Sequence, residues 1–398
     1  MKKALSVNTI HSRIKALRER MEKMNGFDTL MIISRVNQFY FTGTIQDGVL
    51  VIQKNGEEIF FVRKSVARAK DESAFEKIIP IRSYKDMRAY LSENLGHVYI
   101  EKEIVPLAML DRIQKYFKME KISPLDGVLS ALRAVKSDDE VELIRQSAYL
   151  HAKLMNEVVP SLLREGISET DFAGQLYAEM LRMGHHGVSR FAMFQMEAVI
   201  GQLGFGINSI YPTNFDGPGG MKGMYPAVPI LGERESTLKQ GELVFVDVGF
   251  GYQGYHSDKT QIYAFGSEPD AHVLRTHRAC MDVLKKAESL LKPGADPGEL
   301  YDQCVQDLPE ELSVNFMGKG ADAVRFLGHG VGLYIDELPI ITSNYHVPLQ
   351  KNMIIAIEPK CAIEGVGLVG VEETYVITED GAQCLTGGAT EIIVVPEF

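Results

Sequence analysis

The chain has 398 residues, of which 45% are hydrophobic and 24% are charged. This length exceeds one ordinary core of about 100–200 residues, and the composition excludes a disordered chain, so we expect two folded domains. The formal net charge is −11. An acidic surface repels phosphate backbones and anionic lipid headgroups alike, which argues against nucleic acid or a membrane as a partner.

The sequence carries no signal for membrane insertion or export. No run approaches the roughly 18 consecutive apolar residues of a membrane span, and the basic N-terminus meets polar residues before any apolar region forms. The cysteines lie far apart without a C-x-x-C pair, which argues against a zinc knuckle or a dense disulfide framework. We therefore expect a cytoplasmic protein.

The first part of the chain alternates helices and strands. Apolar spacing predicts an amphipathic helix over residues 12–24. Short strands are predicted at residues 29–34, 48–53, 58–62 and 97–101. This alternation indicates an α/β N-terminal domain, to which we assign residues 1–134.

The pattern changes after residue 134. Ser137 and Glu140 begin and end a capping-box sequence, which predicts a helix running toward Pro160. Further helices are predicted over residues 168–184 and 271–291, and strands at 243–248, 260–265, 353–357 and 372–377. We assign residues 135–398 to a second domain of the α+β class.

Acidic residues lie at the ends of these predicted strands. Asp247 ends one apolar strand and Asp258 precedes the next, while Glu358 ends another and Glu372 begins a fourth. A buried carboxylate is costly unless it is hydrogen-bonded or neutralised, and a divalent cation neutralises two at once. Either aspartate alone is more often a turn residue or a solvated surface acid. The repeated placement, rather than any single acid, indicates a cation site.

His329 lies between glycines in the segment FLGHGVGL, where the imidazole has room and the backbone can approach a ligand. A single histidine of this kind is more often a hydrogen-bonded loop residue. Four carboxylates and one neutral imidazole are, however, hard or borderline ligands that suit Mn²⁺, Fe²⁺, Co²⁺ or Zn²⁺.

The C-terminal half resembles the Xaa-Pro aminopeptidase, prolidase and methionine aminopeptidase superfamily. The resemblance rests on five segments in order: VDVGFGYQGYHSDKT, FLGHGVGL, DELP, AIEP and VEETYVITEDG. The N-terminal half resembles a creatinase-type domain through RIKALRERMEKMNGFDTLMI, YFTG and LRAVKSDDEVELIRQSA. The resemblance implies a creatinase/prolidase-like N-terminal domain, a pita-bread catalytic domain over residues 135–398 and, as is common in the family, a homodimer.

The resemblance also implies a two-metal ligand set. Asp258 and Glu372 would bridge the two divalent ions, Asp247 would bind one ion, and His329 and Glu358 would bind the other. In such sites the ions share a water and lower its pKa, so that a bridging hydroxide attacks an amide carbonyl of a small peptide or amide-like substrate. Glu358 and His329 are the predicted catalytic residues, with Glu358 as proton shuttle.

The chain departs from the peptidase pattern around the substrate. Asp336 and Thr213 stand where the peptidases usually carry histidines, and Gly370 stands where an arginine is common two residues before the last glutamate ligand. Those histidines are understood to contact the scissile carbonyl and the developing oxyanion. Losing one such donor removes about 2.7–4 kcal/mol of transition-state stabilisation unless another group replaces it.

Four residues are predicted to contact the substrate: Asp336, Thr213, His185 and His186. The two histidines follow a predicted helix, and the helix dipole alone also favours histidine at that place. Asp336 could equally cap a turn.

Three functions fit the sequence. The preferred one is a metal-dependent hydrolase of the Xaa-Pro aminopeptidase or dipeptidase type. The first alternative is a lyase or a C–N hydrolase of a small molecule that uses the same metal site. The second is a binding protein that has lost catalysis, although all five ligand positions hold competent ligands. The fold alone does not decide between them.

Overall fold

The computed structural model of the chain describes residues 3–24 and 26–397. They form two compact units, one ending at Leu132 and the other beginning at Arg133. This division lies close to the boundary that we placed after residue 134. No helix in the described ranges is long and apolar enough to cross a membrane.

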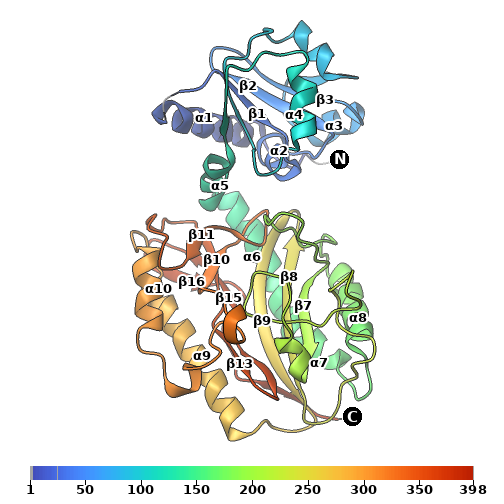
Figure 1. Cartoon of the computed structure of the whole chain (residues 1–398), viewed down its shortest axis with the longest axis vertical. Helices are drawn as coiled ribbons and strands as arrows, with labels where there is room; N and C mark the ends of the chain where they lie inside the picture. Colours follow the sequence, from blue (N-terminus) through green and yellow to red (C-terminus); the bar gives the residue numbers. More distant parts are fainter. Residues whose placement is uncertain (1–2, 25, 398) are drawn as a thin grey trace. The chain divides into compact units, whose positions relative to one another are not determined.

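The described part of the first unit is a six-stranded mixed sheet with strand order β4-β3-β2-β1-β5-β6 (Figure 1). Its elements in chain order are α1 (Val7–Lys23), β1 (Thr29–Ile32), α2 (Arg35–Thr42), β2 (Gly48–Gln53), β3 (Glu58–Val62), α3 (Val66–Glu72), β4 (Ile78–Pro80), η1 (Tyr84–Ala89), β5 (His97–Ile100), α4 (Leu107–Gln114), β6 (Lys121–Pro124) and α5 (Asp126–Ala134), which contains the division.

The predicted first helix and the four predicted strands are confirmed in this unit as α1, β1, β2, β3 and β5. Helix α1 buries Ile14, Leu17 and Met21, which recur at the helical spacing, and the Ser6 side chain caps its first turn. The α/β character expected of this region is therefore present.

The second unit combines a four-stranded sheet (β17-β9-β8-β7), a five-stranded sheet (β11-β10-β12-β15-β16) and the pair β13-β14, as far as the described residues go. Its elements are α6 (Asp138–Lys153), η2 (Leu154–Val158), α7 (Val159–Leu162), α8 (Glu169–Arg182), β7 (Gly201–Phe205), η3 (Gly206–Ile210), β8 (Leu243–Tyr252), β9 (Tyr255–Phe265), α9 (Ala271–Leu290), α10 (Pro297–Val305), η4 (Glu310–Leu312), η5 (Gly320–Asp322), β10 (Gly328–Gly330), β11 (Glu337–Ile341), β12 (Ile354–Ile357), β13 (Lys360–Ile363), β14 (Gly367–Gly370), β15 (Glu373–Ile377), β16 (Ala382–Cys384) and β17 (Ile393–Val395).

The helices of this unit lie on opposite sides of its strands. Figure 1 shows α9 and α10 on one side and α7 and α8 on the other. The predicted capping box at Ser137 and Glu140 is confirmed as the start of α6. The helix that we expected to run toward Pro160 continues from α6 through the π-helical η2 into α7.

Strand β8 separates two hydrophobic cores because successive side chains of a strand point to opposite faces. Val244, Val246 and Val248 belong to the core that includes residues of α7 and α8. Leu243 and Phe245 belong to the core that includes residues of α9, β12 and β15. Asp247 continues the second set, so its carboxylate points toward the second sheet.

A single register runs through four strands of the second unit. In β12 and β15, Ile357 lies opposite Glu373, and in β13 and β14, Lys360 lies opposite Gly370. The two pairings belong to separate sheets but share one register, and the Val371 N–H group donates to the Pro359 carbonyl oxygen between them, so Glu358 and Glu372 occupy matching positions. Side chains at directly opposite positions share a face, so this register sets which groups meet at the site.

Candidate metal centre

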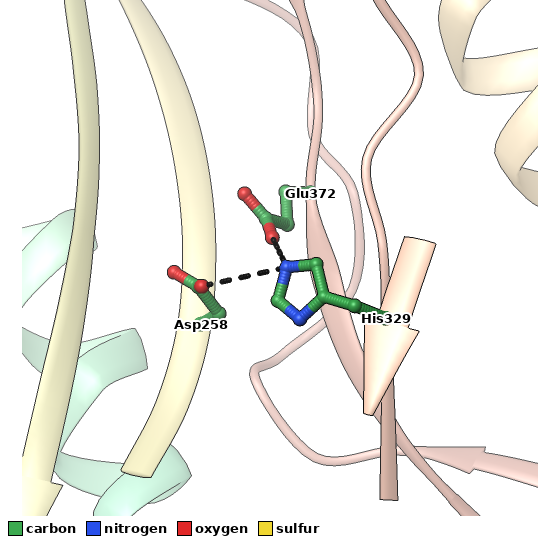
Figure 2. A group of neighbouring side chains, drawn as sticks. All are labelled: Asp258, His329 and Glu372. Atoms are coloured by element: carbon green, nitrogen blue, oxygen red, sulfur yellow. Dashed lines mark ion pairs between the residues drawn. The ribbon is translucent and has the colours of Figure 1, made fainter. Parts of the chain in front are cut away.

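The five predicted ligands converge in the second unit from separate strands. Asp258, His329 and Glu372 each offer a ligand atom within 4.8 Å of the others. Figure 2 shows the His329 ring directed at both carboxylates. Asp247, Glu358 and Glu372 form a second group of the same size. The two groups share Glu372.

The β8-β9 hairpin brings the two aspartates together. Asp247 pairs with Thr260, and Asp258 pairs with Gly249, so the aspartates occupy diagonal positions on one face of the ladder. Thr260 also forms a bridge with Glu372, which joins β9 to the segment that enters β15. The site therefore lies where the two sheets meet.

The His329 ring is oriented as a metal ligand. Its Nδ1 atom lies 3.1 Å from the Gly330 carbonyl oxygen, which can only accept, so Nδ1 carries the proton. Nε2 faces three carboxylate oxygens, at 3.5 Å from Glu358 Oε1 and at 3.9 Å from both Asp258 Oδ2 and Glu372 Oε1. Metal-binding histidines commonly donate the other ring N–H to a carbonyl in this way.

The Glu372 Oε1 atom is buried and has no hydrogen-bond partner among the described residues. A carboxylate oxygen left in this state is unfavourable unless a cation satisfies it. The spacings of 3.5–3.9 Å around His329 Nε2 are of the order expected between ligands of one ion bonded at about 2.0–2.2 Å. Asp258, His329, Glu358 and Glu372 therefore fit a divalent ion.

Sequence reasoning missed a further residue of the site, Lys360. Its side chain is fully buried, and Nζ donates to Asp247 Oδ2 at 2.9 Å, Glu358 Oε2 at 2.8 Å and Glu372 Oε2 at 2.9 Å. The sequence did contain an indication of this contact. Lys360 follows Glu358 by two positions, and residues two apart in a strand lie on the same face. The intervening Pro359 hides the continuation of the strand.

Lys360 occupies part of the space of the predicted two-ion site. An ammonium group already binds the three oxygens that would complete the second ion site around Asp247. The acidic cluster therefore already contains one cation, the Lys360 ammonium group. It leaves a position for one further cation beside His329.

Burial and mutual repulsion shift the protonation of these groups. Burial raises the pKa of Asp247 to about 6, an effect that Lys360 opposes. Burial and the neighbouring Glu372 and Asp247 raise the pKa of Asp258 well above its usual range. Burial opposes the charge of Lys360, but the attraction of Asp247, Glu358 and Glu372 outweighs it and raises the pKa of Lys360. The lysine is therefore a cation at neutral pH.

Asp336 and Thr213 lie in loops of the same unit. Asp336 Oδ1 accepts a 2.8 Å hydrogen bond from the Ala192 N–H group, and burial raises the pKa of Asp336 while His329 opposes the shift. Asp336 is thus electrostatically coupled to the metal centre. The Thr213 hydroxyl oxygen accepts from the Phe215 N–H group, and Thr213 lines a cavity of about 530 Å³ with Gln195 and Glu197.

His185 and His186 hold the end of the β8-β9 hairpin. Nδ1 of His185 accepts from the Gly251 N–H group, and Nδ1 of His186 accepts from the Gly254 N–H group. Burial lowers the pKa of each histidine to about 4, so both are neutral near pH 7. These contacts give both residues a structural role, and their predicted contact with substrate stays a prediction.

The neighbouring glutamate, Glu373, belongs to a different ion pair. It contacts the buried Lys259 ammonium group and accepts from the Gly388 N–H group. Glu372 and Glu373 point to opposite faces of the strand, which explains why only Glu372 joins the metal centre.

The chain belongs to metallopeptidase family M24, whose model matches residues 142–379, and a Creatinase/Prolidase N-terminal domain matches residues 13–135. The predicted superfamily, its creatinase-type N-terminal domain and the pita-bread fold are confirmed. The predicted class of metallopeptidase-type hydrolase is confirmed at the level of the family.

Among individual relatives, the chain is similar to an Xaa-Pro dipeptidase of Pyrococcus horikoshii, with 25% identity over 97% of this chain and 100% of the relative. An Xaa-Pro dipeptidase of Pyrococcus furiosus is 26% identical over 95% of this chain and 100% of the relative.

Solved structures show the same fold. An Xaa-Pro dipeptidase from Bacillus anthracis superposes with a TM-score of 0.79 at 20% identity, covering 97% of this chain and 99% of that one. The N-terminal domain of the FACT complex subunit SPT16 from chickpea superposes with a TM-score of 0.72 at 16% identity, covering 97% of each chain. The fold is therefore shared by proteins that are not described as peptidases, and it does not define the reaction.

Proposed function

We propose that the protein is a metal-dependent hydrolase that cleaves an amide bond in a small peptide or amide-like molecule. The observation that supports this most directly is the unpartnered Glu372 Oε1 atom, which lies 3.9 Å from His329 Nε2. A divalent ion held at this place would polarise a carbonyl group and lower the pKa of a coordinated water. Mn²⁺, Co²⁺, Fe²⁺ and Zn²⁺ all suit the ligands.

The side chains have distinct roles in this proposal. Asp258, His329, Glu358 and Glu372 hold the ion, and Glu358 also carries a proton between water and the leaving amine. Asp247 completes a site for the second predicted ion only if Lys360 leaves it. Asp336, Thr213, His185 and His186 are the proposed substrate contacts.

The relatives support a dipeptide as the first substrate class to test, because two of them are named Xaa-Pro dipeptidases. A cytoplasmic homodimer remains our proposal for the assembled enzyme.

A second candidate is a lyase or a C–N hydrolase of a small non-peptide molecule. Asp336, which interacts electrostatically with His329, favours it, since the ionised form of this carboxylate would repel a developing oxyanion and attract an amine or amide donor.

The test is a substrate panel with Mn²⁺-loaded protein. The panel contains Xaa-Pro dipeptides, other dipeptides and small N-substituted amides, with products followed by mass spectrometry. We expect hydrolysis of at least one amide, its loss on treatment with chelator, and its loss in His329→Ala. Stoichiometric metal binding without turnover of any panel member would instead indicate a binding protein.

A further inference from the structure

Lys360 is buried more completely than a lysine normally tolerates. Its side chain is 0% exposed, whereas lysines are almost never fully buried unless they are paired. Here the pairing is threefold, because the ammonium group has three N–H donors and the cluster supplies three carboxylate oxygens at 2.8–2.9 Å. The Lys360 side chain is therefore an integral part of the acidic cluster.

Gly370, directly opposite Lys360, lets the two backbones approach closely, because a Cβ atom there would lie 2.4 Å from the Pro359 carbonyl oxygen. A Cβ atom at position 370 would lie 2.6 Å from Lys360 Cα and 3.1 Å from Lys360 Cγ. Gly370 also has a φ of 130°, which other residues rarely adopt. The arginine common in the family at this position does not fit this local backbone, which also carries Lys360.

The two shared glutamates divide their oxygens between two cation positions. Oε2 of Glu358 and Oε2 of Glu372 bind Lys360, while Oε1 of each faces His329 Nε2. One position is filled by the ammonium group, and the other is lined by the orphaned Glu372 Oε1 atom.

We propose that the Lys360 ammonium group takes the place of one of the two metal ions of this family, so that the chain binds a single divalent ion at Asp258, His329, Glu358 and Glu372. The inference rests on the proposed metal-dependent function and specifies its stoichiometry. An ion bonded to carboxylate oxygens at about 2.0–2.2 Å would compete with Nζ for the same three oxygen atoms and the same space. Like charge adds repulsion between the two cations.

The rival explanation is that Lys360 only replaces the missing arginine and stands beside two ions. The two explanations differ in the number of ions bound by the unmodified chain, which can be measured without any assay of activity.

The experiment is equilibrium dialysis of chelator-treated full-length protein against Mn²⁺, with bound metal counted by mass spectrometry and the Mn²⁺ signal recorded by electron paramagnetic resonance. The unmodified chain should bind one ion and give the six-line spectrum of an isolated Mn²⁺. Lys360→Met, which removes the charge and keeps the length, should bind two ions and give a spin-coupled spectrum. Lys259→Met, which removes a buried lysine that pairs with Glu373, should still bind one.

Each other result has a defined meaning. Two ions in the unmodified chain would overturn the inference while leaving the proposed function intact. One ion in both the unmodified chain and a folded Lys360→Met variant would also overturn it, because the lysine would then not exclude the second ion. No ion in either chain would contradict the proposed metal-dependent function itself. If Lys360→Met does not fold, the number of Mn²⁺ ions bound by the unmodified chain still distinguishes the two explanations.

Discussion

The Thr260 hydroxyl group donates a 2.9 Å hydrogen bond to Oε2 of Glu372, and the same two residues form the bridge that joins β9 to the start of β15. Oε2 is also the oxygen that Lys360 binds. The two donors fix the rotation of the carboxylate, and this rotation is what directs Oε1 at His329.

Thr260→Val should therefore weaken metal binding without removing a ligand. Loss of a hydrogen bond that orients a ligand typically costs 10–100-fold in metal affinity, and we expect a change of about that size for Mn²⁺ by isothermal titration calorimetry. Thr260→Ser keeps the hydroxyl group and is the matched control. Equal affinity in the valine variant and the unmodified chain would mean that Thr260 does not orient Glu372.

The two aspartates of the hairpin should respond differently to the same change. Asp258→Asn removes a charge that faces His329 and should abolish most metal binding. Asp247→Asn alters a group that binds Lys360 and should leave one ion bound. Metal analysis of both variants after dialysis checks this contrast. Full metal content in Asp258→Asn would refute the assignment of this residue as a ligand.

The unmodified protein should cleave simple Xaa-Pro dipeptides slowly or not at all. Asp336 interacts electrostatically with His329, and its ionised form only accepts hydrogen bonds, so that form cannot stabilise an oxyanion. Restoring both donors in Thr213→His with Asp336→His should raise kcat, because one oxyanion donor contributes about 10²–10³-fold.

The measurement is kcat for an Xaa-Pro dipeptide series with the metal-loaded proteins, and each single replacement serves as a control. Robust hydrolysis by the unmodified chain would show that the two histidines are dispensable here.

The contribution of His185 to the stability of the metal-free protein should be lost as the pH falls from about 6.5 toward 4. An unfolded histidine titrates near 6.5, whereas burial and the neighbouring His186 lower the pKa of His185 to about 4. Between these values the unfolded chain binds more protons, so acid favours unfolding. The groups packed on the His185 ring are His186, Tyr177 and Phe250.

His185→Asn isolates this contribution, because the asparagine oxygen can accept the Gly251 N–H group as Nδ1 does and does not titrate. The urea midpoint of the variant should vary less with pH than that of the unmodified chain. An identical pH dependence in the two proteins would show that folding does not lower the pKa of His185.

The metal ligands were predictable from sequence because acids recur beside apolar, strand-like runs. Asp247 and Asp258 nevertheless lie inside β8 and β9 and not at the strand ends that we expected. The hairpin that carries Asp247 and Asp258 and the strand that follows Glu372 are visible as short apolar runs, and β9 begins earlier than the predicted residue 260. The choice of Glu372 over Glu373 came from the resemblance, and the structure gives its physical reason in the ion pair of Glu373 with Lys259.

The cation in the centre was not predictable in the same way. Lys360 follows a proline, and a lysine near a strand end usually reaches solvent. The Lys360 side chain is buried because β13 pairs with β14 in the register that places Lys360 opposite Gly370. Local sequence patterns do not define this register. The short strands β7 and β10 were not predicted for a related reason, since pairing with the distant strands β8 and β12 holds them in place.

The Lys360 ammonium group, which is covalently part of the chain, also affects whether folding must wait for metal binding. Without it, folding would bring four carboxylates together before any ion had arrived, and their repulsion would oppose the last step. With it, three of the four already have a counterion supplied by the chain itself. The nascent protein can therefore reach its final architecture in a metal-poor environment and acquire its ion afterwards.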